Sequence, residues 1–290
     1  MCRLFAMSGG RERVRATFWL LDAPDSLSEQ SRREPDGTGL GYYDADGRPV
    51  VSKQATAAFE DHEFAREAKE VSSRTFVAHV RYASTGGLSE RNTHPFEQDG
   101  RLFAHNGVVE GLDALEAELG DAMELVTGDT DSERLFALIT RETRRSGDVA
   151  EGIAAAARWV AANLPVFAIN LVLITADELW ALRYPDSHDL LVLERAAGGP
   201  GADAQMSHRS PRGRIRVHSG DLADQRAVVV ATERMDDDPG WAPLGCGELL
   251  HVDADLDVTR RQVLDTPPAH PLTLQDLGAK AAASQGAQTR

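Results

Sequence analysis

The sequence predicts an α+β protein built as a layered sandwich. Segments typical of strands gather near both ends of the chain, and the longest helical segments cluster between residues 112 and 163. That order favours layers of helix on sheet over alternating βαβ units, in which the two kinds of element would interleave along the whole chain.

The strands are predicted from the alternation of side chains along short, mostly apolar segments. The run from Phe76 to Arg81 is the strongest case, and Asp46-Gly47 supplies a turn between two other strands. The predicted strands are Met1–Met7, Gly39–Tyr43, Pro49–Gln54, Thr75–Tyr82, Arg101–His105, Ala168–Thr175, Leu179–Tyr184, Leu190–Glu194, Arg214–His218, Ala227–Thr232 and Glu248–Val252.

The helices lie mainly in the middle of the chain, and a polar loop without strong periodicity covers Ser26–Gly37. The predicted helices are Ala16–Asp22, Asp61–Glu70, Leu112–Leu119, Ser132–Arg145 and Val149–Asn163. We assign residues 1–265 to one domain. Residues 266–290 form a tail rich in Pro, Ala, Gln and Gly, for which we expect poor order.

Composition excludes several classes of function. The net charge of −15 disfavours binding to phosphate backbones, so nucleic acid is not an expected partner. No apolar run approaches the roughly 20 residues that span a bilayer, and we expect no membrane association. The N-terminus, with Arg3 as its one basic residue, fits no signal peptide. These features predict a cytoplasmic protein in which Cys2 and Cys246 are free thiols.

A cysteine directly follows the initiator methionine. Removal of Met1, which is normal before a small residue, places a thiol and a free α-amine on Cys2. An α-amine has a pKa of about 7.7–8.0, so it can take the proton of its own thiol near neutral pH. Chance alone often places Cys at position 2, and the interpretation therefore depends on the motifs that follow.

Three later stretches supply the other parts of an amide-cleaving site. Arg81 ends a strand, and its planar guanidinium can bind a carboxylate through two parallel hydrogen bonds. Asn106 and Gly107, at the end of another strand, can aim an amide and a backbone N–H at an oxyanion. Asp131 opens a helix and can hold an ammonium group. Each feature also has a structural interpretation: a surface arginine, an Asn-Gly turn, and a helix N-cap at Asp131 or Ser132.

Each of these motifs is common by itself, but their order along the chain is specific to one family. The motifs are Met1-Cys2-Arg3-Leu4, Ala78-His79-Val80-Arg81, Asn92-Thr93-His94-Pro95-Phe96, Ala104-His105-Asn106-Gly107, Thr130-Asp131-Ser132-Glu133, Ala231-Thr232-Glu233-Arg234 and Asp236-Asp237-Asp238-Pro239-Gly240-Trp241. With them the chain resembles the class II glutamine amidotransferases, which are N-terminal-nucleophile hydrolases, over most of residues 2–255. It resembles the stand-alone group that includes the γ-glutamyl hydrolase of ergothioneine biosynthesis.

The resemblance implies a four-layer αββα sandwich and an amidohydrolase that cleaves the γ-amide of glutamine or of a γ-glutamyl compound through a Cys2 thioester. The implied site residues are catalytic Cys2, Asn106 and Gly107, and substrate-binding Arg81 for the carboxylate, Asp131 for the amine and Ser84 for a hydroxyl contact. We expect His79, His94 and His105 to be structural. The segment Gly37-Thr38-Gly39-Leu40-Gly41 departs from the Gly-Trp-Gly stretch of many relatives.

Several questions stay open at the level of sequence. No metal-ligand spacing and no nucleotide fingerprint occurs, so we expect neither a metal nor a cofactor. Nothing after Leu264 is long enough for an attached synthase domain, which leaves a transient synthase partner or the direct hydrolysis of a γ-glutamyl compound. A catalytically silent γ-glutamyl-binding or regulatory module is the alternative, and a papain-like protease fits poorly. The oligomeric state has no signature.

Overall fold

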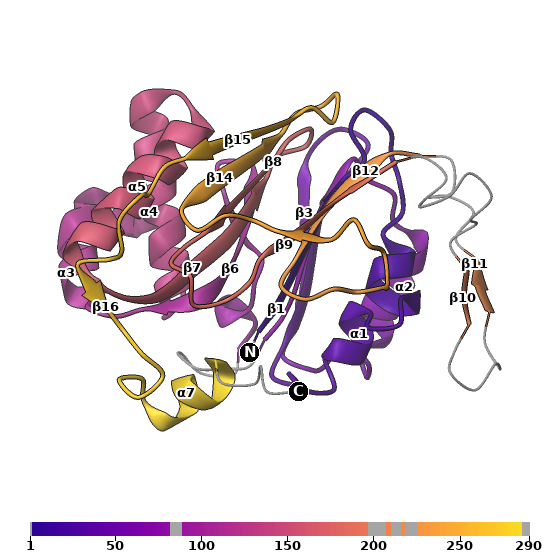
Figure 1. Cartoon of the computed structure of the whole chain (residues 1–290), viewed down its shortest axis with the longest axis horizontal. Coiled ribbons are helices and arrows are strands. Elements are labelled where there is room, and N and C mark those ends of the chain that lie inside the picture. Colours follow the sequence, from indigo (N-terminus) through magenta and orange to yellow (C-terminus); the bar gives the residue numbers. More distant parts are fainter. Residues whose placement is uncertain (1, 82–88, 197–206, 210–215, 219–224, 286–290) are drawn as a thin grey trace.

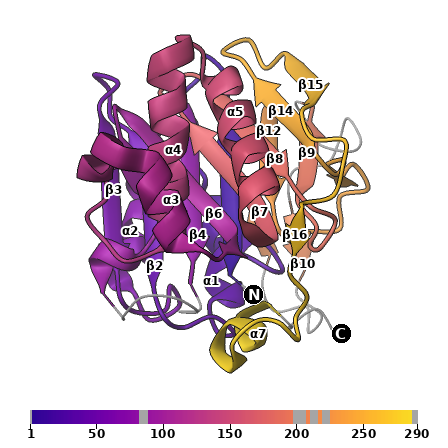
Figure 2. The same cartoon turned by 90° about the vertical axis from the view of Figure 1, so that its left-hand side faces the viewer.

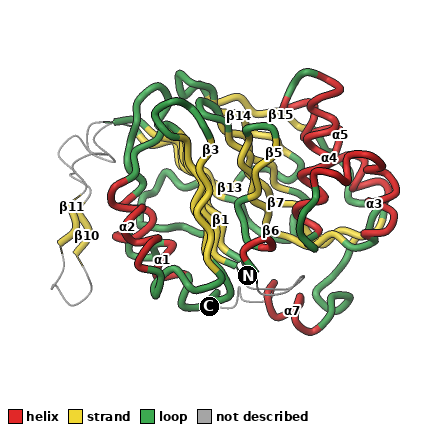
Figure 3. Tube along the Cα trace, turned by 180° about the vertical axis from the view of Figure 1, so that it is seen from behind, coloured by secondary structure: helices red, strands yellow, loops and turns green. Residues whose placement is uncertain are grey.

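The computed structural model describes residues 2–81, 89–196, 207–209, 216–218 and 225–285. Two antiparallel sheets pack face to face, and helices cover the outer face of each sheet, which gives the four layers seen edge-on in Figure 1. The predicted αββα sandwich is confirmed. Figure 3 shows the same layers from behind, with loops joining them at both ends.

The first sheet has β1 at its centre. Its strands run in the order β13 (Ala242–Pro243), β9 (Leu191–Arg195), β12 (Ala227–Ala231), β1 (Arg3–Ser8), β4 (Thr75–Val80), β2 (Thr38–Tyr43) and β3 (Pro49–Gln54). The second sheet runs in the order β15 (Val258–Gln262), β14 (Glu248–Val252), β8 (Leu179–Arg183), β7 (Pro165–Ile174), β6 (Arg101–Val109) and β5 (Phe96–Gln98), with β16 (His270–Pro271) parallel to β7.

The helices divide between the two outer faces. On the second sheet lie α3 (Leu112–Leu119), η3 (Gly120–Leu125), α4 (Asp131–Ser146) and α5 (Val149–Asn163), which face the viewer in Figure 2. On the first sheet lie η1 (Phe18–Asp22), α1 (Leu27–Gln30) and α2 (His62–Glu70). The remaining elements are η2 (Glu90–Asn92), the paired strands β10 (Ser207–Arg209) and β11 (Arg216–His218), and α7 (Ala279–Gln285).

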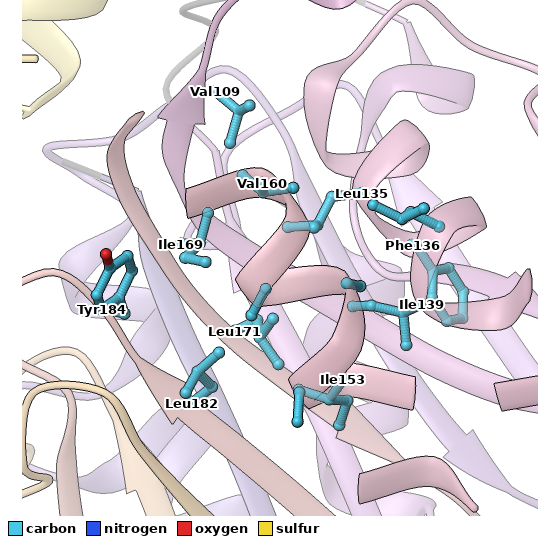
Figure 4. Packing of buried hydrophobic residues seen from close by; sticks show 14 of the residues in the cluster. Val109, Leu135, Phe136, Ile139, Ile153, Val160, Ile169, Leu171, Leu182 and Tyr184 are labelled. Atoms are coloured by element: carbon cyan, nitrogen blue, oxygen red, sulfur yellow. The ribbon is translucent and has the colours of Figure 1, made fainter. Parts of the chain in front are cut away.

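Three apolar cores separate the layers. The outer cores lie between each sheet and its helices; Figure 4 shows the one in which Leu135 and Ile139 of α4 pack toward Ile169 and Leu171 of β7. The inner core lies between the sheets. Because both faces of β6 and β7 are covered, alternate residues of each strand enter different cores. None of the helices that the structure describes combines the length and apolar character needed to cross a bilayer.

Most predicted elements are found within a few residues of their expected bounds, but two details at the site were wrong. The strand expected to end at His105 continues to Val109, so Asn106 and Gly107 lie within β6 instead of in a turn. The N-cap of α4 is Thr130, whose Oγ1 accepts from Glu133 N at 3.2 Å, and is neither Asp131 nor Ser132.

Other differences concern short elements. Part of the predicted loop Ser26–Gly37 forms α1, and the helix predicted from Ala16 is limited to η1. The elements β5, β13, β15, β16 and α7 were not predicted from the sequence. Within the predicted tail, β16 pairs with β7 and Leu277 is buried, while the domain boundary at residue 265 stays a prediction.

Candidate active site

Cys2 and Arg81 lie opposite each other at one end of the first sheet. The antiparallel register pairs Arg3 with Val80 and Leu4 with His79, so Cys2 falls opposite Arg81 one step further. Side chains of such directly opposed residues have Cβ atoms about 4.5–5.5 Å apart. Leu4 belongs to the inner core, and Cys2, two residues away, faces the same side. Cys2 is 8% exposed and Arg81 4%.

The guanidinium of Arg81 is a buried cation surrounded by acidic groups. Burial lowers its pKa, and electrostatic interaction with Cys2, Asp36 and Asp131, in this order, opposes that shift. The backbone of Arg81 is fixed as well, because its N–H donates to Gly37 O at 2.8 Å and its carbonyl accepts from Asp36 N at 3.0 Å. Asp36 was not among the predicted site residues. A fork held in this way is suited to bind a carboxylate in two hydrogen bonds.

Asn106 faces Cys2 and Arg81 from the second sheet. Its neighbours Leu102 and Ala104 enter the inner core, and the alternation along β6 places the Asn106 side chain on the same face. The two sheets are aligned by Thr75 Oγ1, which donates to Thr175 O at 2.5 Å. Packed sheets keep their strands nearly parallel. The end of β4, which lies six residues beyond Thr75, is therefore level with the pair Asn106–Asn170.

The side-chain amide of Asn106 is buried without hydrogen-bond partners. The residue is 1% exposed, and neither Nδ2 nor Oδ1 has a partner among the described residues. An unsatisfied buried polar group costs about 1–3 kcal/mol, and native proteins contain few of them. Both hydrogen-bonding atoms of this amide are therefore available to a ligand.

Gly107 presents a backbone N–H on the open edge of β6. Ile169 N donates to Tyr184 O, toward β8, so odd-numbered residues of β7 face β8 and Asn170 faces Asn106. Gly107, the next residue on β6, must then turn its N–H away from β7. Any side chain here is excluded, because a Cβ would lie 1.8 Å from Ala168 O.

Asp131 lies along that same open edge. Its Oδ2 accepts from Val109 N at 2.9 Å, two residues beyond Gly107, and it is 3% exposed. It is the first residue of α4, where the helix dipole favours a carboxylate. Glu133 holds the preceding loop, accepting from Thr127 N at 3.1 Å and Gly128 N at 2.6 Å.

Three buried histidines surround these groups without adding positive charge. Burial lowers the pKa of His79 to about 3, that of His94 well below its usual value, and that of His105. The His79 and His94 rings lie 4.3 Å apart. His105 Nε2 donates to Ala168 O at 3.2 Å, so its Nδ1 accepts from Ser132 Oγ at 2.9 Å. The three rings are thus neutral near pH 7.

The start of β1 is anchored by residues from distant segments. Arg3, turned away from the inner core, pairs with Glu233 at 2.7 Å and Glu34 at 3.8 Å. Thr232 Oγ1 accepts from Leu4 N at 3.2 Å, and Thr232 N donates to Leu4 O at 3.1 Å. The motif at residues 231–234 therefore serves to hold the strand that carries Cys2.

Of the six predicted site residues, five are described. Cys2 and Asp131 both lie within electrostatic reach of Arg81, and Asn106 and Gly107 lie on the facing strand. Ser84 lies outside the described residues. In the segment that departs from the Gly-Trp-Gly pattern, Thr38 is buried and its Oγ1 donates to Thr56 O at 2.8 Å.

Comparison with known proteins identifies the family of the chain. Residues 1–271 match the sequence profile of the family described as class-II glutamine amidotransferases. The chain belongs to this family. Among curated relatives, a probable glutamine amidotransferase of Saccharomyces cerevisiae, DUG3, is 31% identical over 159 residues, which are 48% of this chain and 44% of that protein.

A second amidotransferase relative covers more of the chain. The isomerizing glutamine–fructose-6-phosphate aminotransferase of Mycolicibacterium paratuberculosis is 27% identical over 243 residues, 80% of this chain and 38% of that protein. The chain thus spans less than half the length of these curated relatives.

Solved structures support the fold. A glutamine aminotransferase class-II domain protein of Silicibacter pomeroyi superimposes with a TM-score of 0.59 at 21% identity, over 90% of this chain and 99% of that one. The glutamine phosphoribosylpyrophosphate amidotransferase of B. subtilis gives 0.62 at 20% identity, over 92% of this chain and 50% of that one. The amidotransferase chain has the N-terminal-nucleophile hydrolase fold.

Two further features of the amidotransferase chain concern thiols and metals. Neither Cys2 nor Cys246 forms a disulfide within the described part of the chain, as predicted, and burial raises the pKa of the Cys246 thiol. The described part of the chain contains no group of three or more His, Cys, Asp or Glu side chains placed to hold a metal ion.

Proposed function

We propose that this amidotransferase hydrolyses the γ-amide of glutamine or of a γ-glutamyl compound, with Cys2 as nucleophile. The observation that carries the proposal is the amide of Asn106, which is buried, has no hydrogen-bond partner among the described residues, and lies on the strand that faces Cys2 and Arg81. A group kept in this state at a cost of about 1–3 kcal/mol is expected where a reacting oxygen will occupy its donors.

The substrate's α-amino acid group is bound by opposite charges. Arg81 receives the α-carboxylate in its planar fork, and Asp131 receives the α-ammonium. The two side chains carry complementary charge and lie near each other, which supports their joint role. Ser84 is assigned a hydroxyl contact to the bound glutamyl group on the basis of the family motif alone.

The reaction proceeds in two acyl-transfer steps. After Met1 is removed, the Cys2 α-amine takes the thiol proton, and the sulfur attacks the γ-carbonyl carbon. The oxyanion accepts hydrogen bonds from Asn106 Nδ2 and the Gly107 N–H. The α-ammonium then protonates the leaving nitrogen as the C–N bond breaks. Water, deprotonated by the same amine, cleaves the γ-glutamyl thioester to release glutamate and free Cys2.

Two versions of this function differ in the leaving group. If glutamine is the substrate, the ammonia leaves for a separate synthase in a transient complex. If a γ-glutamyl amine or peptide is the substrate, as in the ergothioneine-type group that the sequence resembles, glutamate is the by-product. A silent regulatory module is disfavoured, because it gains nothing from an unpartnered Asn106 amide.

The direct test compares the two cysteines. Glutamate release from glutamine and from a panel of γ-glutamyl compounds is measured for wild type, Cys2→Ala and Cys246→Ser. We expect Cys2→Ala to abolish turnover without unfolding the protein, and Cys246→Ser to keep it, because Cys246 lies on the loop between β13 and β14. Turnover near the wild-type rate in Cys2→Ala would overturn the proposal.

A further inference from the structure

The inner core does not extend past Asn106, yet the second sheet does. On β6, Val108 shares the face of Asn106, and Ala168 lies opposite it on β7. Val108, Phe167 and Ala168 form a separate apolar cluster with Leu277, and among its described members none comes from the first sheet. The C-terminal segment therefore covers the face of β6 and β7 that continues from the candidate site.

The segment is attached at both of its ends. β16 pairs with Pro165 and Val166 of β7, and Leu272 N donates to Val166 O at 2.8 Å. At the far end of α7, His188 Nε2 donates to Gln285 Oε1 at 2.9 Å. His188 is 5% and Gln285 2% exposed, so this contact is sealed from solvent.

The residues on which α7 packs are held by hydrogen bonds and an aromatic contact. The carbonyl of His188 accepts from Arg183 Nε at 2.8 Å and from Asn170 Nδ2 at 3.2 Å, and its ring packs against Phe167 with centroids 5.0 Å apart. Burial lowers the pKa of His188 to about 4, with the nearby cation Arg3 also lowering it, so the ring is neutral. Figures 1 and 2 both place α7 beside the start of β1.

The direction in which the substrate lies follows from the position of Asp131, which is proposed to bind its α-ammonium group. Asp131 lies on the edge of β6 that faces away from β7, so the glutamyl chain approaches from that edge. At a planar amide the leaving nitrogen points away from the acyl chain. With the carbonyl oxygen at Asn106 and Gly107, the leaving group is therefore directed over β7, toward Ala168 and the C-terminal segment.

We propose that residues 270–285 form the wall of the leaving-group subsite and restrict the enzyme to γ-glutamyl amides with a small, uncharged leaving group. This inference rests on the proposed function. Its apolar lining, Val108, Ala168 and Leu277, offers no partner for a charged leaving group, and the buried His188–Gln285 contact holds the end of α7 in place.

The test measures kcat/KM for glutamine and for γ-glutamyl-p-nitroanilide, whose leaving group is bulky. Leu277→Ala removes the side chain that packs on Val108 and Ala168, and we expect the anilide-to-glutamine ratio to rise about tenfold or more, the scale of a change in pocket volume. Leu274→Ala is the matched control, because Leu274 is on the same segment but 42% exposed, and its ratio should equal that of wild type.

A second variant guards against loss of folding. Gln285→Ala removes one hydrogen bond at the end of α7, and it should raise the same ratio in a protein that melts as wild type does. An unchanged ratio in folded Leu277→Ala or in Gln285→Ala would overturn the inference.

Labelling separates this inference from the proposed function. The glutamine analogue 6-diazo-5-oxo-norleucine carries the α-carboxylate and α-ammonium groups that Arg81 and Asp131 are proposed to bind. It alkylates the nucleophile and has no bulky leaving group. We expect wild type and both variants to be labelled at Cys2 at similar rates. Failure to label wild type would contradict the proposed function, whereas normal labelling with an unchanged substrate ratio would contradict only the role of the C-terminal segment.

Discussion

Asn106→Ala should separate catalysis from stability. The substitution removes one oxyanion donor, and loss of such a donor typically costs about 2.7–4 kcal/mol of barrier, or a factor of about 10²–10³ in kcat. Stability should respond differently, because Nδ2 and Oδ1 have no hydrogen-bond partner to lose in the part of the chain that the structure describes. Removing the unsatisfied polar groups should raise the free energy of unfolding by about 1–3 kcal/mol, while the small cavity should lower it by ~1 kcal/mol.

Asn170 provides a matched control, since it lies directly opposite Asn106 in the β6–β7 pair and is equally buried. Its amide is fully used: Oδ1 accepts from Tyr184 N at 3.1 Å, and Nδ2 donates to His188 O. Asn170→Ala leaves Tyr184 N unpaired, while His188 O keeps its hydrogen bond from Arg183 Nε. At about 1–3 kcal/mol for an unpaired buried group and ~1 kcal/mol for the small cavity, we expect the protein to lose about 2 kcal/mol or more.

The assay is a glutamate-release measurement with a thermal melt of the same samples. A loss of 2 kcal/mol lowers the Tm of a chain of this size by roughly 4–8 °C, so the two variants are easily distinguished. Asn106→Ala should melt at or above the wild-type temperature with kcat reduced at least about a hundredfold. If Asn106→Ala is as destabilised as Asn170→Ala, or turns over normally, the oxyanion argument is refuted.

Three further substitutions test other parts of the site. Arg81→Lys should raise KM for substrates with a free α-carboxylate more than it lowers kcat, because an ammonium cannot make the bidentate contact; an unchanged KM would remove Arg81 from the site. Gly107→Ala should cost about 1–3 kcal/mol or more in a urea unfolding experiment, because its Cβ would overlap Ala168 O, whereas Gly278→Ala, with no atom within 4 Å, should cost nothing. His79 is neutral in the folded protein, where its pKa is about 3, whereas in the unfolded chain it binds a proton below about pH 6.5. Its contribution to the free energy of unfolding is therefore complete above about pH 6.5 and declines as the pH falls toward 3. His79→Gln should flatten this acid-side decline by up to about 1.4 kcal/mol per pH unit, and an unaltered slope measured by urea unfolding would exclude the histidine as its source.

The layers and the family were predictable because their signals are local. Alternation along residues 76–81 and the helical segment at 149–163 each depend on neighbouring residues, and they match β4 and α5 closely. The order of Cys2, Arg81, Asn106 and Asp131 was informative because each residue type suits one step of amide cleavage.

What the sequence missed depends on contacts between distant segments. The dipeptide Asn106-Gly107 is typical of a turn, but β7 continues to pair with it, and the tertiary contact overrides the local preference. Asp36 and Glu233 reach Arg81 and Arg3 across gaps in sequence that no periodicity encodes. The composition of the tail suggested poor order. Leu277 nevertheless packs on the apolar face of β6 and β7, a contact that the composition of the tail does not encode.

The most direct test of the central claim is peptide mass spectrometry of the active enzyme after treatment with 6-diazo-5-oxo-norleucine. The account predicts that Met1 is absent and that the reagent, less dinitrogen, is attached to Cys2 in proportion to lost activity. An active enzyme that retains Met1, or an inactivated one labelled at Cys246 and not at Cys2, would contradict it.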